Sequence, residues 1–397
     1  MLPTALDCRA MSTLPGLPNS LAVELRERIA AGGPLPFAEF MAACLYHPQY
    51  GYYMTPRERI GKAGDFFTST SVHAMFGRLV ARQLMQMAAL LGDVPLEVVE
   101  QGAGEGHLAL DILDTLAGEA PDLYIRLTYT LVEVGPASRA RQAETLAAHA
   151  ARVAWCAADE WRIGSGCFLS NELVDAFPVY VVEKRAGKLH EVFVNNAADG
   201  GFVEELHPPS TPALEEHCRW LGVAPVEGNR AEINLAAPVW IRQVAGRISR
   251  GFVITIDYGY PAAELYALHR REGTLLCYRQ HQADDDPYSA VGEKDITAHV
   301  DFTALRQAGE EAGLRTLWFG EQYRFLLGLG FFEELLRLQA QCTDEREARA
   351  LRLTLKNLIV PEQGMGETFK VLVQGKGVGQ PELLCARQIS AIPFAGL

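Results

Sequence analysis

Short apolar runs alternate with amphipathic stretches through the middle of the chain. Each run has the length and composition of a buried strand, and helical spacing follows most of them. The expected strands are 96–101, 127–134, 151–158, the start of 166–179 and 251–257, and the helices between them include 107–117 and 136–150. Because strands and helices alternate, we expect an α/β fold with a Rossmann-like, largely parallel sheet.

Two regions depart from this alternation. Ahead of the sheet, the pattern predicts a helix from Ser20 to Gly32 and a second, amphipathic helix that Gly92 ends. After Tyr180, glycine turns separate short strands of antiparallel type. The expected parts are a flexible lead (1–19), a helical N-terminal segment (20–92), a ligand-binding core (93–180 and 251–397) and an inserted subdomain (181–250) that faces the substrate.

The segment VVEQGAGEG, residues 98–106, carries the clearest chemical signal. Gly102, Gly104 and Gly106 alternate between the first core strand and the next helix, and Glu100 precedes them. In an open parallel sheet, ligands bind at this edge, where glycine permits close approach and the helix N-terminus offers free N–H groups. A tight turn without a ligand is the alternative, but three alternate glycines favour binding, with Ala103 inside the same loop.

The glycine spacing bears on which ligand binds. A dinucleotide fingerprint reads G-x-G-x-x-G, whereas this loop reads G-x-G-x-G. Glu133, at the end of the second core strand, is placed to accept hydrogen bonds from a ribose, although a solvated strand end is the alternative. The pattern favours S-adenosylmethionine (SAM) over a nicotinamide cofactor, and Asp159, after the third strand, is a candidate for the adenine.

Composition limits which binding partners and which cellular compartment are expected. The 36 basic and 49 acidic residues give a net charge of −13, which argues against a broad nucleic-acid surface. No run approaches the 18 or so apolar residues of a membrane span, and the 8 cysteines form no C-x-x-C pair. We therefore expect no membrane span and a reducing compartment, either the bacterial cytoplasm or, in a eukaryote, the mitochondrial matrix.

A metal site is not expected. The three aspartates 284–286 precede a proline and are typical of a solvated turn. His281 and His299 lie far apart without ligand spacing, and a buried histidine is the simpler interpretation of His299.

Several segments, in order, resemble the MidA family of class I SAM-dependent methyltransferases. They are GDFFTS, VVEQGAGEGHLALDIL, YTLVEVGPASRARQ, FLSNELVDAFPV, GFVITIDYGYP, GTLLCYRQH, GEKDITAHVDFTAL and PEQGMGETFKVLVQGKG, between about Leu35 and Gly377. The resemblance implies a seven-stranded methyltransferase sheet. For the mitochondrial members, which assist the assembly of respiratory complex I, it also implies dimethylation of a protein arginine.

The resemblance also assigns a role to GDFFTS. It implies that this loop faces the cofactor, with Gly64, Asp65, Thr68 and Ser69 as candidate ligands, while a helix N-cap is the alternative for the hydroxyls. Family members usually continue with proline and glutamate, where this chain has Thr70 and Ser71. This difference bears on substrate choice.

The segment SNELVDAFP supplies the candidates for acceptor chemistry. Asn171 and Glu172 follow an apolar strand, and if the chain turns helical there, Glu172 and Asp175 share a face. Asn171 is also a candidate cofactor ligand. Two carboxylates can hold a guanidinium by charge-assisted bonds, whereas capping a helix or pairing with a nearby arginine is the alternative. Asp257 ends another core strand and either lines the pocket or forms a turn with Gly259.

The leading prediction is a SAM-dependent methyltransferase that acts on a protein arginine. Methylation of a small molecule and a non-catalytic, SAM-binding assembly factor are the alternatives, and a nicotinamide dehydrogenase is disfavoured by the glycine spacing. The partner is then a methyl-acceptor protein or small molecule. A homodimer is left open.

Overall fold

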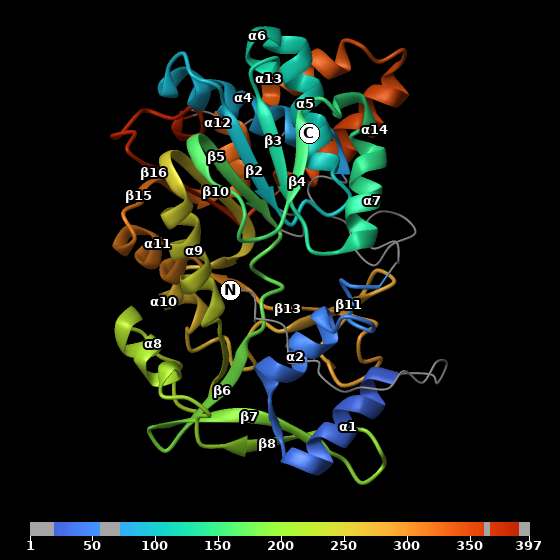
Figure 1. Cartoon of the computed structure of the whole chain (residues 1–397), viewed down its shortest axis with the longest axis vertical. Helices are drawn as coiled ribbons and strands as arrows, with labels where there is room; N and C mark the ends of the chain where they lie inside the picture. Colours follow the sequence, from blue (N-terminus) through green and yellow to red (C-terminus); the bar gives the residue numbers. More distant parts are fainter. Residues whose placement is uncertain (1–19, 56–71, 361–365, 389–397) are drawn as a thin grey trace.

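A mostly parallel sheet occupies the centre of the computed structural model, which describes residues 20–55, 72–360 and 366–388 (Figure 1). Seven strands follow one another in the order β15-β16-β10-β5-β2-β3-β4, and β14 pairs with β10 as an eighth. Their bounds are β2 (Glu97–Gln101), β3 (Thr128–Val132), β4 (Val153–Cys156), β5 (Ile163–Asn171), β10 (Ile248–Tyr260), β14 (Val300–Asp301), β15 (Arg315–Glu321) and β16 (Phe369–Lys376). All neighbours are parallel except β16, which runs antiparallel to β10 and β15.

Helices cover both faces of this sheet, which is why its central strands are apolar on both sides. One core lies under α4, α5, α12 and α13, and a second lies under α9 and α11. The helices of the sheet region are α4 (Met75–Leu91), α5 (His107–Glu119), α6 (Pro121–Tyr124), α7 (Pro136–Thr145), α9 (Ala236–Arg247), α10 (Ala262–Leu265), α11 (Phe302–Glu311), α12 (Gln322–Gly328), α13 (Phe331–Gln339) and α14 (Glu345–Lys356). Two short 3₁₀ turns span Ala147–His149 and Leu384–Ala386.

A second, antiparallel sheet lies beside the main one. Its order is β1-β7-β6-β9, with β8 on β7, and a three-stranded sheet β12-β11-β13 accompanies it. The bounds are β1 (Leu35–Pro36), β6 (Tyr180–Arg185), β7 (Lys188–Asn196), β8 (Phe202–His207), β9 (Arg230–Ile233), β11 (Leu276–Arg279), β12 (Gln282–Asp284) and β13 (Asp295–Thr297). Helix α8 (Ala213–Leu221) lies between β8 and β9 in the chain.

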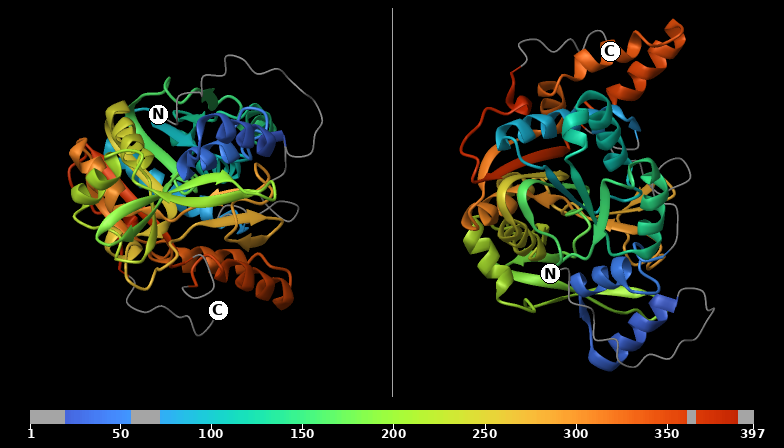
Figure 2. Two further views of the ribbon diagram at one scale, coloured as in Figure 1. Left: turned by 90° about the horizontal axis from the view of Figure 1, so that it is seen from below. Right: turned by 45° about the horizontal axis from the view of Figure 1, so that its top comes forward.

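The N-terminal helices belong to this second layer. Helices α1 (Ser20–Gly32) and α2 (Phe37–Tyr46) pack with β6, β7 and the β11–β13 region in one apolar cluster. Helix α4, by contrast, packs on the main sheet, so the predicted segment 20–92 divides between two cores. Figures 1 and 2 show α1 and β8 at one end of the molecule and α13 and α14 at the other.

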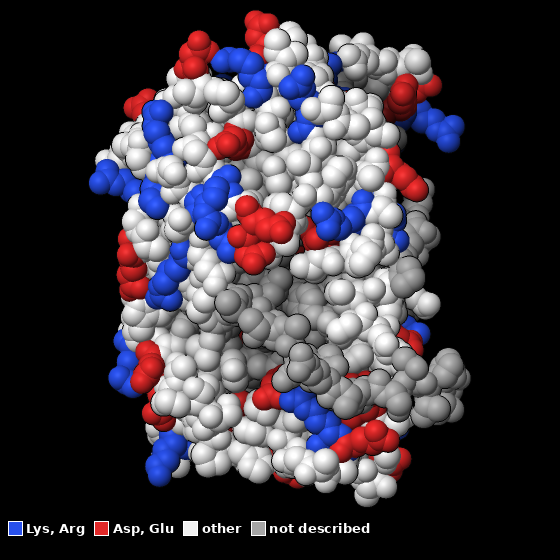
Figure 3. All heavy atoms as spheres, viewed as in Figure 1, with Lys and Arg blue, Asp and Glu red and all other residues white. Residues whose placement is uncertain are grey.

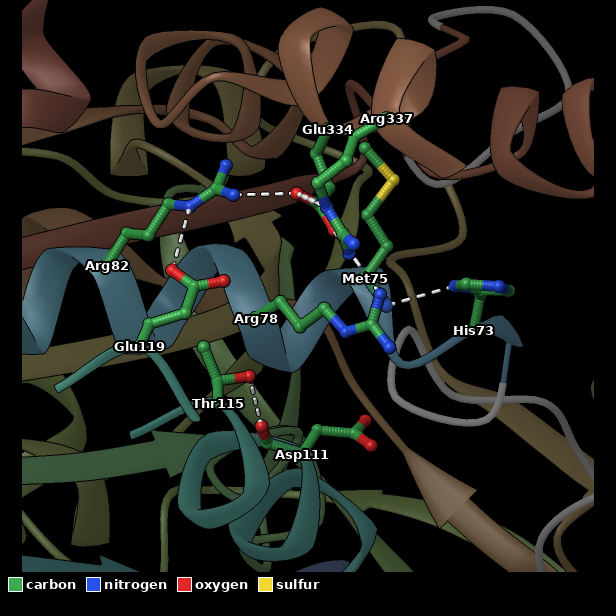
Figure 4. A network of polar contacts seen from close by, with 9 residues as sticks. All are labelled: His73, Met75, Arg78, Arg82, Asp111, Thr115, Glu119, Glu334 and Arg337. Carbon is green, nitrogen blue, oxygen red and sulfur yellow. Dashed lines mark hydrogen bonds and ion pairs between the residues drawn. The ribbon is translucent and has the colours of Figure 1, made fainter. Parts of the chain in front are cut away.

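Helix α4 is tied to α13 by one buried carboxylate. Glu334, whose side chain is fully buried, lies 2.6 Å from Arg82, 3.3 Å from Arg78 and 2.5 Å from Arg337 (Figure 4). Burial alone would raise the pKa of Glu334, but the hydrogen bonds from Arg337 and Arg82 hold it at about 2. Three cations therefore share one anion between these two helices.

Charge distribution and helix length are the structural features to which the expectations from composition refer. On the face shown in Figure 3, acidic and basic side chains are interspersed, without a broad patch of one sign. Among the described residues, no helix combines the length and apolar character required to cross a membrane.

Candidate functional site

The glycine loop after β2 has a backbone that other residues adopt with strain. Gly102, Gly104 and Gly106 have φ angles of 76°, 55° and 87°, in the left-handed region. A Cβ atom at Gly102 would lie 2.8 Å from the Leu173 side chain, which belongs to the predicted acceptor segment. The backbone conformation therefore favours glycine at position 102, and a larger residue would also displace the end of the Leu173 side chain. Ala103, in the same loop, is half-buried.

Glu100 lies beneath this loop. Its carboxylate is buried and accepts a hydrogen bond from the Tyr129 hydroxyl at 2.7 Å. Burial raises the pKa of Glu100 to about 7, and the hydrogen bond from Tyr129 opposes that shift. The contact with Tyr129 joins β2 to β3, and a contact of Glu100 with the cofactor stays a prediction.

Glu133 follows β3 and is oriented from both sides. Oε1 accepts the backbone N–H of Gly135 at 2.7 Å, and Oε2 accepts the side-chain amide of Gln142 at 3.2 Å. The same amide donates to the carbonyl oxygen of Gly104 at 2.8 Å. Glu133 and the glycine loop, predicted separately, are thus joined by Gln142, which the sequence did not single out.

The predicted acceptor segment, residues 170–178, contains a strained residue. Glu172 follows β5 with a φ of 51°, a left-handed conformation that is uncommon for a residue with a side chain. Its N–H donates to the carbonyl of Ile256 at 2.9 Å, and its carboxylate accepts the Asn171 amide at 3.0 Å. The chain then forms turns instead of the helix that would place Glu172 and Asp175 on one face, so that expectation is wrong.

Asp257 supports this segment from behind. Its Oδ2 accepts the backbone N–H groups of Leu173, Val174 and Asp175, at 3.2, 2.9 and 3.4 Å, and its Oδ1 accepts that of Tyr258 at 3.0 Å. The side chain is fully buried, and burial together with the nearby Asp175 charge raises its pKa. Asp257 therefore holds the backbone of residues 173–175, and its role at the pocket stays a prediction.

The two carboxylate oxygens of Asp175 differ in their hydrogen bonds. Oδ2 accepts the Tyr258 hydroxyl, whereas the buried Oδ1 has no hydrogen-bond partner in the part of the chain that the structure describes. Burial raises the pKa of Asp175 to about 6, and the Tyr258 hydrogen bond opposes the shift. The Oδ1 of Asn171 is likewise buried and open among the described residues.

A second acid–tyrosine pair lies nearby. The Tyr53 hydroxyl donates to Asp295 at 2.8 Å, the Tyr46 hydroxyl donates to the carbonyl of Ala176 at 2.9 Å, and the two tyrosine rings stack 5.6 Å apart. Burial, and then the charges of Asp295 and Asp175, raise the pKa of both tyrosines. The second layer therefore meets the carboxyl edge of the main sheet here, where acidic groups and tyrosines gather.

The remaining predicted ligands lie apart or outside the described residues. Asp159 is exposed in the turn after β4. Gly64, Asp65, Thr68 and Ser69 fall within 56–71, outside the described residues.

One aspartate of the run 284–286 pairs with a lysine. Lys294 Nζ lies 2.8 and 2.7 Å from the two carboxylate oxygens of Asp284 and 3.0 Å from the carbonyl of Asp286. His299 packs its ring against those of Tyr258 and Tyr260. Across the described ranges, no group of three or more His, Cys, Asp or Glu residues is arranged to hold a metal ion.

Comparison with known proteins assigns the chain to a family. The model of a family described as putative S-adenosyl-L-methionine-dependent methyltransferases matches residues 79–320. The chain belongs to this family. A solved structure from Burkholderia thailandensis bound to S-adenosyl-homocysteine is 36% identical, with a TM-score of 0.84 over 92% of this chain and 94% of that one.

Curated relatives agree with this assignment. A Drosophila melanogaster protein named protein arginine methyltransferase NDUFAF7 homolog, mitochondrial, is 30% identical over 91% of this chain and 86% of its own length. The Mus musculus NDUFAF7 is 28% identical over 91% of this chain and 86% of its own length. The predicted α/β methyltransferase fold, SAM as cofactor and methyltransferase activity are confirmed, and the nicotinamide alternative is excluded.

Proposed function

We propose that the chain transfers methyl groups from SAM to a protein arginine. The observation that carries this proposal is the buried Oδ1 of Asp175, which has no hydrogen-bond partner among the described residues and lies in the same segment as Asn171 and Glu172. The relatives named as protein arginine methyltransferases support the same acceptor.

A guanidinium suits this site because it carries only donors. Buried acceptors without partners cost free energy, and a planar cation with several N–H groups satisfies them. Asp175 Oδ1 and Asn171 Oδ1 are two such acceptors among the described residues. A carboxylate that localises the positive charge on one side of the guanidinium favours a lone pair on the nitrogen that is methylated. Glu172 would hold the acceptor from the other side of Asn171.

In this proposal, the cofactor binds at the loops that follow strands β2 and β3. SAM supplies an electrophilic methyl group on sulfur, and transfer leaves S-adenosylhomocysteine. The chain's own task is to align the acceptor nitrogen with that methyl group, and to take up or shield the proton that the nitrogen loses. Gly102, Gly104 and Gly106 with the N-terminus of α5 would approach the cofactor, and Glu133 would accept its ribose hydroxyls.

The compartment remains part of the proposal. Seven cysteines in the described ranges are free thiols, which supports a reducing compartment such as the bacterial cytoplasm or the mitochondrial matrix. The relatives above are named as mitochondrial.

The test follows methyl label from SAM into arginine peptides and into matched peptides with lysine at the same positions. We expect label on the arginine peptides alone. Asp175→Asn should lower kcat/KM at least about a hundredfold, because an amide neither localises the positive charge nor accepts a proton, while the Kd for S-adenosylhomocysteine stays within about twofold.

The control is Asp122→Asn, which changes an exposed acid on α6 that has no proposed role in binding or catalysis. Label on lysine peptides, or on small molecules of a cell extract but not on any arginine peptide, would overturn the arginine assignment. Unchanged turnover in Asp175→Asn would remove Asp175 from the mechanism.

A further inference from the structure

Gln142 lies on α7, behind the glycine loop, and is completely buried. A glutamine side chain has two N–H donors and one carbonyl acceptor. Here Nε2 donates to Gly104 and to Glu133, and Oε1 accepts the indole N–H of Trp155 at 3.0 Å. One side chain therefore links the loop after β2, the carboxylate after β3 and a residue of β4.

The contacts made by Gln142 are specific to an amide. Gly104 and Glu133 both present acceptor oxygens, so a donor is required between them. Trp155 presents an N–H, so an acceptor is required on the other side. A glutamate at position 142 would direct a carboxylate at two other oxygens, and a leucine would leave all three partners without this contact.

The position of Gln142 matters because its amide bonds the carbonyl of Gly104 within the glycine loop. Gly104 adopts a φ of 55° in a loop of alternating glycines, where backbone freedom is large. The Gln142 bond fixes the Gly104 carbonyl, and the same nitrogen fixes one oxygen of Glu133 while Gly135 fixes the other. A single amide thus bonds both the loop and the carboxylate.

We propose that Gln142 is a positioning residue that presets the Glu133 carboxylate for the ribose hydroxyls of the cofactor. This inference rests on the proposed ribose role of Glu133. A preset carboxylate loses less conformational entropy on binding, so the contribution of Gln142 appears as affinity for the ribose portion of the cofactor.

Calorimetric titration with two ligands tests this role. One ligand is S-adenosylhomocysteine, and the other is its analogue whose ribose lacks both hydroxyls. In Gln142→Leu, we expect the Kd for S-adenosylhomocysteine to rise at least about tenfold and the Kd for the analogue to rise less than about threefold. Gln142→Glu keeps the size of the side chain and should weaken S-adenosylhomocysteine at least as much.

Two variants serve as controls. Trp155→Phe removes only the bond to Oε1 and should leave the Kd for S-adenosylhomocysteine within about threefold. Tyr124→Phe removes a hydrogen bond of 2.8 Å to His149 away from the loop and should leave both affinities unchanged. Thermal melting of every variant shows whether each is folded at the titration temperature.

The outcomes separate the inference from the function on which it rests. Equal weakening of both ligands in Gln142→Leu would make Gln142 a packing residue and overturn the inference. Unchanged affinity for S-adenosylhomocysteine in Glu133→Gln would overturn the ribose role itself. A third outcome is that Glu133→Gln weakens the binding of S-adenosylhomocysteine while Gln142→Leu and Gln142→Glu do not. It would leave the ribose role of Glu133 in place and overturn only the inference about Gln142.

Discussion

Asp175 accepts a hydrogen bond from Tyr258 and keeps its other oxygen open among the described residues, so its ionisation controls how the site receives a cation. Its raised pKa of about 6 means that a carboxylate is present above pH 6 and a neutral acid below it. We expect kcat/KM for the arginine peptide to fall as the pH drops through about 6. The Tyr258 hydroxyl stabilises the ionised form of Asp175. Removing this hydroxyl should therefore move the acidic side of the pH profile of kcat/KM.

Tyr258→Phe removes the hydrogen bond that lowers the pKa of Asp175, while burial still raises it. The acid limb of kcat/KM should therefore move to higher pH, by about one unit. The measurement is a pH profile of initial rates for the wild type and the variant. Tyr260→Phe is the matched control, since the Tyr260 ring packs against Arg270 and His299. An acid limb at the same pH in both variants would show that Asp175 is not the titrating group.

At the level of single residues, the sequence identified groups that follow strand ends. Gly102 and Asp175 were found because loops after parallel strands meet at one edge of a sheet. Gln142, Tyr258 and Asp295 were missed because their partners lie on other elements. The contact of Asp295 with Tyr53 spans 242 positions, and no local periodicity encodes such a pair.

At the level of elements, helices α4 and α13 are linked by ion pairs to a buried carboxylate. Glu334 has a pKa of about 2 when folded, below its ordinary value, so its contribution is fully present above about pH 4.5 and is lost as the pH falls toward 2. Removing the carboxylate leaves Arg78, Arg82 and Arg337 facing one another around a buried position.

Glu334→Gln should lower the free energy of unfolding at pH 7 by about 2–3 kcal/mol, less than for a fully buried pair because the three arginines are partly exposed. Urea denaturation of wild type and variant between pH 7 and pH 3.5 measures this difference, which should shrink below pH 4.5. The control is Glu333→Gln, whose exposed side chain pairs with Arg387 and should change stability by less than about 0.5 kcal/mol. Equal effects of the two variants would contradict the assignment.

The sequence predicted the long core strands better than the short ones. Strands β2, β3, β5 and β10 are largely buried on both faces, and their sequences are apolar runs. Strand β14 has 2 residues, too few for any period, so the eighth strand of the sheet was not foreseen. Strand β1, also of 2 residues, pairs with β7 at Leu35 and Val194, a contact between distant segments that only the folded chain creates.

At the level of the whole molecule, the proposed cofactor side and the proposed acceptor side are built from different parts of the chain. The glycine loop, Glu133 and Gln142 belong to the main sheet and α7, whereas Tyr46 and Tyr53 come from α2 and the residues after it, in the second layer. The two groups are neighbours, since burial, and then the charges of Asp295, Asp175 and Glu133, raise the pKa of Tyr46. The two sides meet at the segment 170–178, where the Ala298 N–H also donates a hydrogen bond to the Asp175 carbonyl at 3.0 Å. Such a division predicts that the two binding functions can be weakened separately.

Tyr53→Phe tests this division from the acceptor side. The variant removes the hydrogen bond to Asp295 and leaves every described contact of the glycine loop intact, so we expect the KM for the arginine peptide to rise about five- to tenfold. The Kd for S-adenosylhomocysteine should stay within about twofold, the reverse of the expected result for Gln142→Leu. Tyr50→Phe, whose ring stacks on His47 at 5.2 Å, is the control. If Tyr53→Phe weakened S-adenosylhomocysteine as much as the peptide, the two layers would form one binding unit, and acceptor recognition could not be assigned to the second layer.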